Sequence, residues 1–303
     1  MATALARSYL YAPGDRPSLL DKVMTAGADA VILDLEDSVP AAGKEAAREA
    51  VATAVGARRG RPSPAVWVRI NGETGDWKAD LERIVVEGLR GVRLPKVESA
   101  AWLSEVAGEL DRLESARGLA PESLRLTATV ESAAGGLAAS ELARASRVDH
   151  LAFGSSDYLA DVGANPESED TATLWVRSHL VVVSRAYGIG PPIAPVHTRL
   201  EDDDGLARAC ESSRSLGFFG ASCIHPRQIP VVHRVFSPRP EEVERARRMI
   251  AELERAAGGT AITETGQFLD EAVVRRARAL VELADGLEAE ASRQEPIEEG
   301  SNG

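Results

Sequence analysis

Short apolar runs alternate with helix-like segments along most of the chain. The runs expected to form strands are residues 10–12, 30–35, 66–70, 91–94, 124–130, 148–153, 192–196 and 220–224. The segments that follow them have helical periodicity or an alanine-rich composition, at residues 17–26, 41–55, 80–86, 100–113, 136–145, 171–187, 204–216 and 231–236. Near-continuous apolar strands are typical of a parallel sheet covered by helices on its faces. Eight consecutive strand–helix units favour an α/β fold of the closed (β/α)8 TIM-barrel type.

The first turn argues against the alternative, an open doubly wound sheet. Such a sheet usually carries a G-x-G-x-x-G turn for a nucleotide after its first strand. Here Pro13-Gly14-Asp15-Arg16 stands at that place. The barrel therefore remains the preferred fold.

Charged helices are expected after the last barrel unit, at residues 240–257 and 271–284, and the final residues are polar. We therefore predict a TIM-barrel catalytic domain over residues 1–238, a C-terminal helical extension over 239–290, and a disordered tail over 291–303.

Composition excludes several classes of protein. The chain has 303 residues, of which 44% are hydrophobic, and no apolar run approaches the length of a membrane span. A net charge of −12 and an aromatic content of 4% argue against a nucleic-acid surface, which needs a basic stripe and stacking platforms. Residues 1–6 are too short for a signal peptide, so a cytoplasmic location is expected. Cys210 and Cys223 are expected to be buried free thiols.

Two acids follow neighbouring expected strands. Glu131 directly follows the run 124–130, and Asp157 follows the run 148–153 after Gly154-Ser155-Ser156. Barrel enzymes carry their chemistry at the carboxyl ends of strands, and two carboxylates there suit Mg²⁺, whose other positions are filled by water and substrate oxygens. The alternative for each acid is a helix cap or a rim ion pair.

Other charged residues are expected at the same rim. Arg69 ends a strand and could bind a carboxylate bidentately, or could form a salt bridge to Glu36 or Glu131. Glu36 stands at a strand end where an acid can also simply begin the next helix, and Lys96 follows Pro95, where a structural partner role is the alternative.

Serine and histidine give weaker signals. Ser155 and Ser156 lack the G-x-S-x-G elbow, and we interpret them as loop residues whose backbone N–H groups face the substrate, together with that of Gly154. His197 and His225 lie at strand ends without the spacing of a zinc site. His150, His179 and His233 are expected to be packing or surface residues.

An ordered set of motifs resembles a known family. With the two acidic motifs, these segments resemble the citrate lyase beta-subunit-like family of the HpcH/HpaI aldolase superfamily, over about residues 7–284. The motifs are RSYLYAPGDRP at 7–17, LDLEDSV at 33–39, VRIN at 68–71, LPKVE at 94–98 and IHPRQI at 224–229.

The resemblance implies a TIM barrel that binds Mg²⁺ through Glu131 and Asp157, with Arg69 on the substrate oxygens. Family members cleave or form a carbon–carbon bond next to a thioester of citryl, malyl or citramalyl groups on CoA or on an acyl carrier protein, and the other product is an α-keto acid. In standalone relatives an aspartate after the barrel serves a neighbouring subunit, which makes Asp270 a candidate and predicts a homo-oligomer, a trimer or hexamer, whose C-terminal extension packs on a neighbour. Further candidates are Glu36 for catalysis and Arg16, Lys96, Gly154 and Ser155 for substrate binding.

The chain also departs from the family pattern. Val130-Glu131-Ser132 replaces the more usual isoleucine-glutamate-threonine, a change that keeps the ligand, and residues 191–198 lack the aspartate that relatives usually carry at the seventh strand. The substrate thioester, the choice between lyase and thioesterase, and the carrier therefore stay open.

Two alternative functions also stay open. One is a pyruvate-type aldolase on free hydroxy-keto acids, although the glutamate-histidine pair of such aldolases is Glu36-Asp37 here. The other is a partner-dependent subunit of a citrate lyase complex.

Overall fold

The computed structural model describes residues 5–61, 63–256, 260–263, 266 and 268–294. The chain forms two compact units, Met1–Phe236 and Ser237–Gly303.

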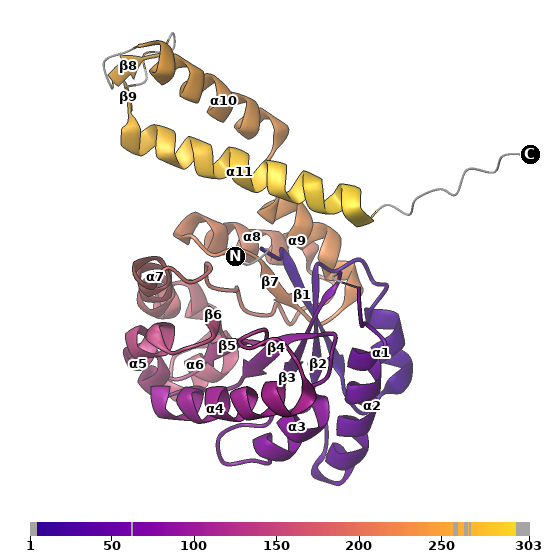
Figure 1. Cartoon of the computed structure of the whole chain (residues 1–303). Coiled ribbons are helices and arrows are strands. Elements are labelled where there is room, and N and C mark those ends of the chain that lie inside the picture. Colours follow the sequence, from indigo (N-terminus) through magenta and orange to yellow (C-terminus); the bar gives the residue numbers. More distant parts are fainter. Residues whose placement is uncertain (1–4, 62, 257–259, 264–265, 267, 295–303) are drawn as a thin grey trace, which may run out of the picture. The chain divides into compact units, whose positions relative to one another are not determined.

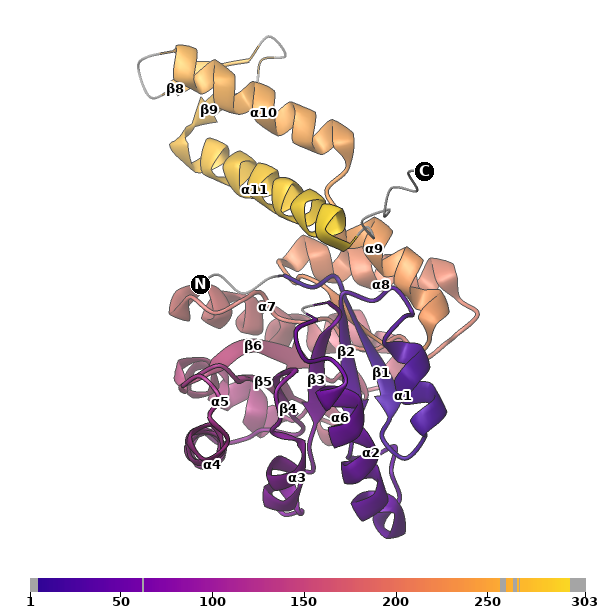
Figure 2. The ribbon, with the colours of Figure 1, turned by 45° about the vertical axis from the view of Figure 1, so that its right-hand side comes forward.

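The first unit is built on a curled, seven-stranded sheet (Figures 1 and 2). Every pair of neighbours in the order β6-β5-β4-β3-β2-β1-β7 is parallel, which confirms the predicted parallel α/β architecture. The strands are β1 (Ser8–Pro13), β2 (Ala30–Asp34), β3 (Ala65–Arg69), β4 (Leu89–Leu94), β5 (Arg125–Val130), β6 (Val148–Phe153) and β7 (Ala221–Cys223).

The strand predicted over residues 192–196 does not form at that length. Ile193 makes one isolated parallel bridge to Ala152 of β6, and Ala194 makes one to Ala221 of β7. Residues 191, 192 and 195 are prolines, which lack an N–H group and cannot extend a strand ladder. Ile193 and Ala194 are therefore the two residues of this segment that form bridges to the edge strands among the described residues.

Helices cover the outside of the sheet in the order expected from the sequence (Figure 1). The α-helices of this unit are α1 (Pro17–Val23), α2 (Lys44–Gly56), α3 (Trp77–Ile84), α4 (Ala100–Arg117), α5 (Ala133–Arg144), α6 (Ser155–Asp161), α7 (Glu169–Tyr187), α8 (Asp203–Leu216) and α9 (Ile229–Phe236). Short 3₁₀ helices occupy η1 (Ala41–Gly43), η2 (Pro166–Ser168) and η3 (Pro226–Gln228).

The interpretation of Ser155 and Ser156 as loop residues is wrong, because both lie in α6. The helix begins directly after Gly154 and carries Asp157 in its first turn, where a negative charge interacts favourably with the helix dipole. The short helix has little periodicity to reveal it in the sequence.

Local signals fix the ends of several helices. The Ser99 side chain accepts a hydrogen bond from the Trp102 N–H at the start of α4, and Gly118 ends that helix with a φ of 65°. Asp202 caps α8 by accepting from the Gly205 N–H at 2.8 Å. These signals define where α4 and α8 begin and where α4 ends.

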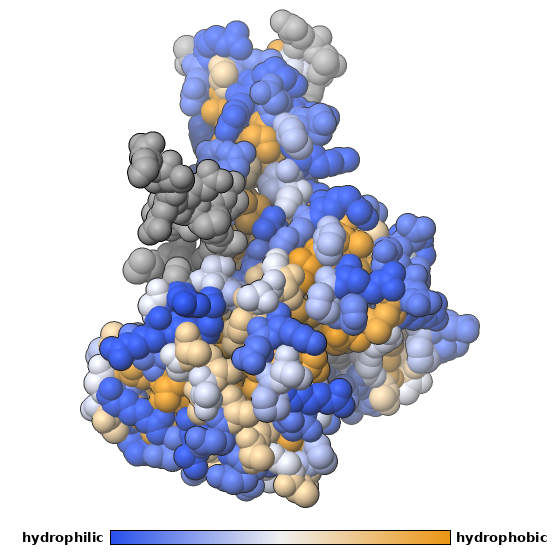
Figure 3. Space-filling model, turned by 90° about the vertical axis from the view of Figure 1, so that its right-hand side faces the viewer, coloured by the Kyte–Doolittle hydropathy of each residue, from blue (hydrophilic) through white to orange (hydrophobic). Residues whose placement is uncertain are grey.

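The interior of the sheet is mostly apolar. Tyr9, Ile32, Trp67, Ala152 and Ile193 form one buried cluster there. Cys210 and Cys223 are buried and free, as expected, and burial raises the pKa of each thiol to about 12. The face of the molecule in Figure 3 is mostly hydrophilic. No helix among the described residues is both long and apolar enough to cross a membrane.

The second unit contains two helices and a small hairpin. Its elements are α10 (Pro240–Arg255), β8 (Thr260–Ile262), β9 (Phe268–Asp270) and α11 (Glu271–Gln294), with β8 and β9 antiparallel. Leu253, Leu269 and Val274 form its apolar core. The helix α11 continues ten residues beyond the predicted 284 to Gln294, so residues 291–294 of the predicted tail are helical. The remaining tail, 295–303, lies outside the described residues.

Candidate active site

The last residues of β2 and β3 form a fixed ion pair. Asp34 and Arg69 are opposite each other in the register of the two strands. The Arg69 guanidinium donates from Nε to Oδ1 of Asp34 at 2.6 Å and from Nη2 to Oδ2 at 2.7 Å. Asp34 is 2% exposed and also accepts from the backbone N–H groups of Glu36 and Ser38. Burial is the largest influence on the pKa of Asp34 and raises it, but the hydrogen bonds and charge of Arg69 and the hydrogen bonds from Ser38 and Glu36 together hold this pKa below its usual value.

Asp34 is a site residue that sequence reasoning missed. It stands at the end of an apolar run within LDLED, two residues before Glu36, but it reads there as part of the strand. The available signal was its polarity at a strand end, opposite an arginine on the next strand. The bidentate capacity expected of Arg69 is thus used inside the protein.

The rest of the Arg69 guanidinium faces Glu36. Nη1 lies 2.8 Å from Oε2 of Glu36, so the predicted alternative of a rim salt bridge is observed as well. Of the five N–H donors of a guanidinium, two donate to Asp34, whereas Nη1 faces Glu36 as an ion pair without hydrogen-bond geometry. The Arg69 side chain is 16% exposed and lies over the ring of Tyr11, 5.2 Å from its centroid. Its orientation is therefore determined on two sides while part of its donor capacity remains.

Glu36 is an unusual carboxyl group. Burial, only partly offset by the positive charge of Arg69, raises the pKa of Glu36 to about 7. Oε2 is buried and makes no hydrogen bond of acceptable geometry among the described residues, despite the short distance to Arg69. A carboxyl group with this pKa can take up or release a proton near neutrality.

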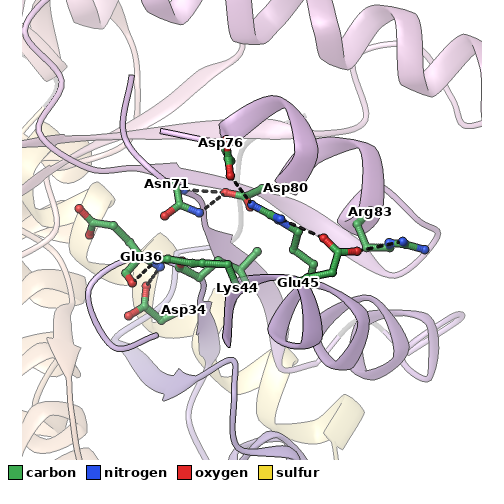
Figure 4. A network of polar contacts seen from close by, with 10 residues as sticks. Asp34, Glu36, Lys44, Glu45, Asn71, Asp76, Asp80 and Arg83 are labelled. Atoms are coloured by element: carbon green, nitrogen blue, oxygen red, sulfur yellow. Dashed lines mark hydrogen bonds and ion pairs between the residues drawn. The ribbon is translucent and has the colours of Figure 1, made fainter. Parts of the chain in front are cut away.

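The backbone that carries Glu36 is held from the side of α2. Nζ of Lys44 donates to the carbonyl oxygens of Leu35 and Glu36, both at 2.6 Å (Figure 4). Figure 4 also shows the support of the residues after β3. There the fully buried Asp80 accepts from both the backbone and side-chain nitrogens of Asn71 and from Nε of Arg48. The ends of β2 and β3 are therefore rigidly positioned.

Lys96 connects the strand ends. Its Nζ lies 3.8 Å from Oε1 of Glu36 and 3.9 Å from Oδ1 of Asp157. The residue has a φ of 47°, a left-handed conformation that is uncommon outside glycine and often occurs at functional sites. The structure thus brings together Lys96, Glu36 and Asp157, which are far apart in the sequence.

Glu131 and Asp157 lie close enough for their charges to interact. Glu131 is 8% exposed, and among the described residues its carboxylate has neither a hydrogen bond nor an ion pair. Burial, followed by the charge of Asp157, raises the pKa of Glu131. The Asp157 side chain is 54% exposed and projects from the first turn of α6. One buried and one accessible carboxylate with free lone pairs fit Mg²⁺, which takes one or two protein carboxylates and keeps water or substrate oxygens. In the described part of the chain, no group of three metal-binding side chains is assembled.

Gly154 leaves room for the side chain of Glu131. A Cβ atom at this position would lie 2.6 Å from Cγ of Glu131, so only glycine lets this carboxylate occupy its place. The Gly154 N–H donates to the carbonyl of Val130 at 3.0 Å and is engaged there. The expectation that this N–H faces the substrate is therefore wrong, whereas Ser155 at the start of α6 stays a candidate.

A second arginine lies in the interior near these groups. Arg93 of β4 is 3% exposed and donates to the hydroxyl groups of Thr129, at 3.2 Å, and Ser222, at 3.1 Å. Its guanidinium lies over the ring of Tyr11, 5.5 Å from the centroid. Sequence reasoning missed Arg93 and Tyr11, although a charged residue within the run 91–94 was a signal.

Other predicted residues are not brought into this cluster. Arg16 is exposed at the start of α1, and no ion pair of the described residues connects it to the acids. His225 caps η3 by accepting from the Arg227 N–H, and Nε2 of His197 lies 3.7 Å from Oδ2 of Asp202. Asp270 belongs to the second unit, where Oδ1 accepts from the Val273 N–H at the start of α11. The role of Asp270 at an active site stays a prediction.

Known proteins resemble this chain over nearly its whole length. The sequence profile of the HpcH/HpaI aldolase/citrate lyase family matches residues 7–226. The citrate lyase subunit beta of Leuconostoc mesenteroides subsp. cremoris is 35% identical over 285 residues, covering 93% of this chain and 94% of that protein. A (3S)-malyl-CoA thioesterase of Cereibacter sphaeroides is 32% identical over 287 residues, covering 93% and 96%.

Solved structures agree with these matches. The crystal structure of the protein CitE of Mycobacterium tuberculosis in complex with magnesium, acetoacetate and coenzyme A superposes with a TM-score of 0.77 at 32% identity, covering 93% of this chain and 99% of that one. A citrate lyase beta subunit of the same organism, complexed with oxaloacetate and magnesium, gives a TM-score of 0.64 at 33% identity, covering 78% and 98%. The chain therefore belongs to the HpcH/HpaI aldolase/citrate lyase family, which confirms the resemblance inferred from its motifs.

Proposed function

We propose that this protein is a Mg²⁺-dependent carbon–carbon lyase that cleaves a 3-hydroxy-3-carboxyacyl thioester of CoA into an acyl thioester and an α-keto acid. The observation that carries the proposal is the buried carboxylate of Glu131, which has no polar partner in the described part of the chain and lies near Asp157 and the Arg69–Glu36–Lys96 cluster. The names of the relatives, a citrate lyase subunit and a malyl-CoA thioesterase, support the thioester class. We further infer that residues 193–194 close the sheet into a barrel, because they bridge β6 and β7.

Glu131 and Asp157 would hold the metal. When bound, Mg²⁺ supplies Lewis-acid polarisation of the substrate oxygens. The protein residues around it determine where protons and charge go.

Glu36 is proposed to accept the proton of the substrate hydroxyl group. Its pKa of about 7 suits a general base at neutral pH. As the O–H bond breaks, its electrons form the carbonyl of the keto acid, and the adjacent C–C bond breaks to leave its electron pair on the thioester as an enolate. Arg69, oriented by Asp34, donates its remaining N–H groups to the oxygen that carries the developing charge.

The enolate then needs a proton at its α-carbon. We assign this step to Asp270 from another copy of the chain, since the family resemblance implies an aspartate after the barrel in that role. This assignment requires a homo-oligomer, which the unit of α10 and α11 would help to form.

Thioester screening tests the proposal. The purified full chain would be incubated with malyl-CoA, citramalyl-CoA and citryl-CoA, with Mg²⁺ or with EDTA, while keto acid and free thiol are followed separately. Keto acid that appears only with Mg²⁺ supports a lyase, and free thiol that follows it adds a thioesterase step. Equal activity in EDTA, or no cleavage of any thioester by the isolated chain, would contradict the proposal; the second result would favour a partner-dependent subunit.

A further inference from the structure

Arg93 differs from the other buried arginines of the first unit. Arg48 forms ion pairs with Asp80, Glu45 and Asp76, Arg147 forms one with Glu114, and Arg177 forms one with Asp170. Arg93 is the least exposed of these four arginines, and no carboxylate of the described residues lies within ion-pair distance of it.

This arrangement is energetically unfavourable in the protein alone. Removing a guanidinium from water is costly, and the cost is offset mainly when a carboxylate takes the place of the lost hydration. Two neutral hydroxyl groups and an aromatic ring offset less of it. A residue retained under such conditions is expected to meet a negative charge that the protein itself does not contain.

The position of Arg93 indicates which charge that is. Its partners lie on β5 and β7, so the side chain extends across the interior of the curled sheet. Thr129 precedes the metal-binding candidate Glu131 by two residues, and the Tyr11 ring that Arg93 contacts also contacts Arg69. Arg93 therefore lies directly next to the candidate active site.

The donor capacity of Arg93 matches a carboxylate. Hydrogen bonds from Nε and Nη1 are accounted for, whereas Nη2 has no hydrogen-bond partner within the described part of the chain. Arg69, by contrast, has already given its bidentate edge to Asp34. Arg93 thus keeps Nη2 and the second N–H of Nη1 for an incoming carboxylate.

We propose that Arg93 binds a carboxylate of the keto-acid half of the substrate. The inference rests on the proposed lyase function and adds the residue that recognises this anionic group. The competing interpretation is that Arg93 only fills the interior and balances the charge of Glu131.

Binding and stability measurements on two variants distinguish these interpretations. Arg93→Met keeps the length of the side chain and removes its charge, and Arg93→Lys keeps the charge without the fork. Arg90→Gln is the matched control, because Arg90 lies on the same strand but is paired with Asp149, which keeps Arg125 as a second partner. Binding of glyoxylate, pyruvate and oxaloacetate to the full chain with Mg²⁺ would be measured by calorimetry, and Tm would be measured for each protein.

We expect Arg93→Met to weaken keto-acid binding on the order of 10- to 100-fold, Arg93→Lys to have a smaller effect of the same sign, and Arg90→Gln to leave binding unchanged. Arg93→Met should keep or raise Tm, since it removes a buried charge without an acidic partner. Unchanged keto-acid affinity in both Arg93 variants would overturn the inference and leave the lyase proposal intact. If Arg93→Met does not fold, Arg93→Lys alone decides by the same criterion. A wild-type chain that binds none of the three keto acids with Mg²⁺ would overturn the proposed function and this inference together.

Discussion

The two sides of the candidate site are organised differently. On the side of β2 and β3, Asp34, Arg69 and Glu36 form an ion-pair cluster whose members are fixed by one another and by backbone groups. On the side of β5 and α6, Glu131 is buried without a polar partner among the described residues, and Asp157 is open to solvent. On the side of β2 and β3, which we call the paired side, the charges are already balanced. The side of β5 and α6, which we call the open side, requires a cation from outside. The comparison indicates that one side orients the reacting groups and the other recruits the metal.

Removing a carboxylate from the open side should have the largest effect. Glu131→Gln keeps the shape of the side chain but removes the charge that would hold Mg²⁺. We expect Mg²⁺-dependent thioester cleavage to fall by more than about 1000-fold, equivalent to ~4 kcal/mol of transition-state stabilisation. Steady-state kinetics over a range of Mg²⁺ concentrations measure this, and Asp157→Asn should act in the same direction. Near wild-type turnover in Glu131→Gln would remove Glu131 from the metal site.

Two substitutions on the paired side, Arg69→Ala and Asp34→Asn, should lower activity by different amounts. Arg69→Ala removes a donor to the developing oxyanion, and such losses typically cost about 100- to 1000-fold in kcat. Asp34→Asn leaves Arg69 charged but weakens the fork that orients it, so a smaller loss, about 10-fold, is expected. The double variant should be no worse than Arg69→Ala, because Asp34 acts through Arg69. Additive effects of the two changes on kcat would show instead that Asp34 acts independently of Arg69.

Adding a methyl group next to Glu131 on the open side should selectively weaken Mg²⁺ binding. Gly154→Ala would place Cβ 2.6 Å from Cγ of Glu131 and push this carboxylate from its position. We expect about a 10-fold loss in Mg²⁺ affinity, comparable to the effect of other residues that orient a metal ligand. Gly136→Ala is a suitable control, because the nearest atom to its Cβ would be a flexible valine methyl group at 3.2 Å. Equal Mg²⁺ affinity in Gly154→Ala and wild type would contradict the steric argument.

The pH dependence should report Glu36 on the paired side. As a base with a pKa of about 7, Glu36 must be ionised, so kcat/KM should rise with pH up to about 7 and then level off. The ionised fraction of such a base, and with it kcat/KM, rises about 8-fold between pH 6 and 7.5. In Glu36→Gln the residual activity should lack this rise.

Stability should respond to Glu36 in the opposite direction. The pKa of Glu36 in the folded chain lies above its ordinary value of 4.5, so the native state binds more protons than the unfolded chain between pH 4.5 and about 7. The contribution of this group to the free energy of unfolding is therefore fully present below about pH 4.5 and is lost as pH rises through about 7. Denaturant unfolding of wild type and Glu36→Gln between pH 5 and 8 measures it, and the two proteins should differ in the slope of stability against pH.

The fold could be predicted largely from the pattern of apolar runs. Parallel strands buried on both faces give a strong signal, and seven of them form close to the expected positions. The strand expected over 192–196 is reduced to two bridged residues because its prolines lack the N–H groups that a strand ladder needs. The helix α6 was missed because seven residues carry too little periodicity.

The candidate site could be predicted only in part. Residues at strand ends are brought together by any parallel sheet, so Glu131, Asp157, Glu36, Arg69 and Lys96 could be proposed from their spacing. Which of them pair with one another depends on side-chain geometry that sequence does not contain, and Asp34 and Arg93 were missed for this reason.

The most direct test of the difference between the two sides is Mn²⁺ binding, followed by electron paramagnetic resonance as a substitute for Mg²⁺. The full chain and the variants Glu131→Gln, Asp157→Asn and Glu36→Gln would be titrated under the same conditions. We predict one Mn²⁺ per chain, strongly weakened binding in Glu131→Gln and Asp157→Asn, and retained binding in Glu36→Gln. Unchanged binding in Glu131→Gln, or its loss in Glu36→Gln alone, would contradict the assignment of the metal to the open side.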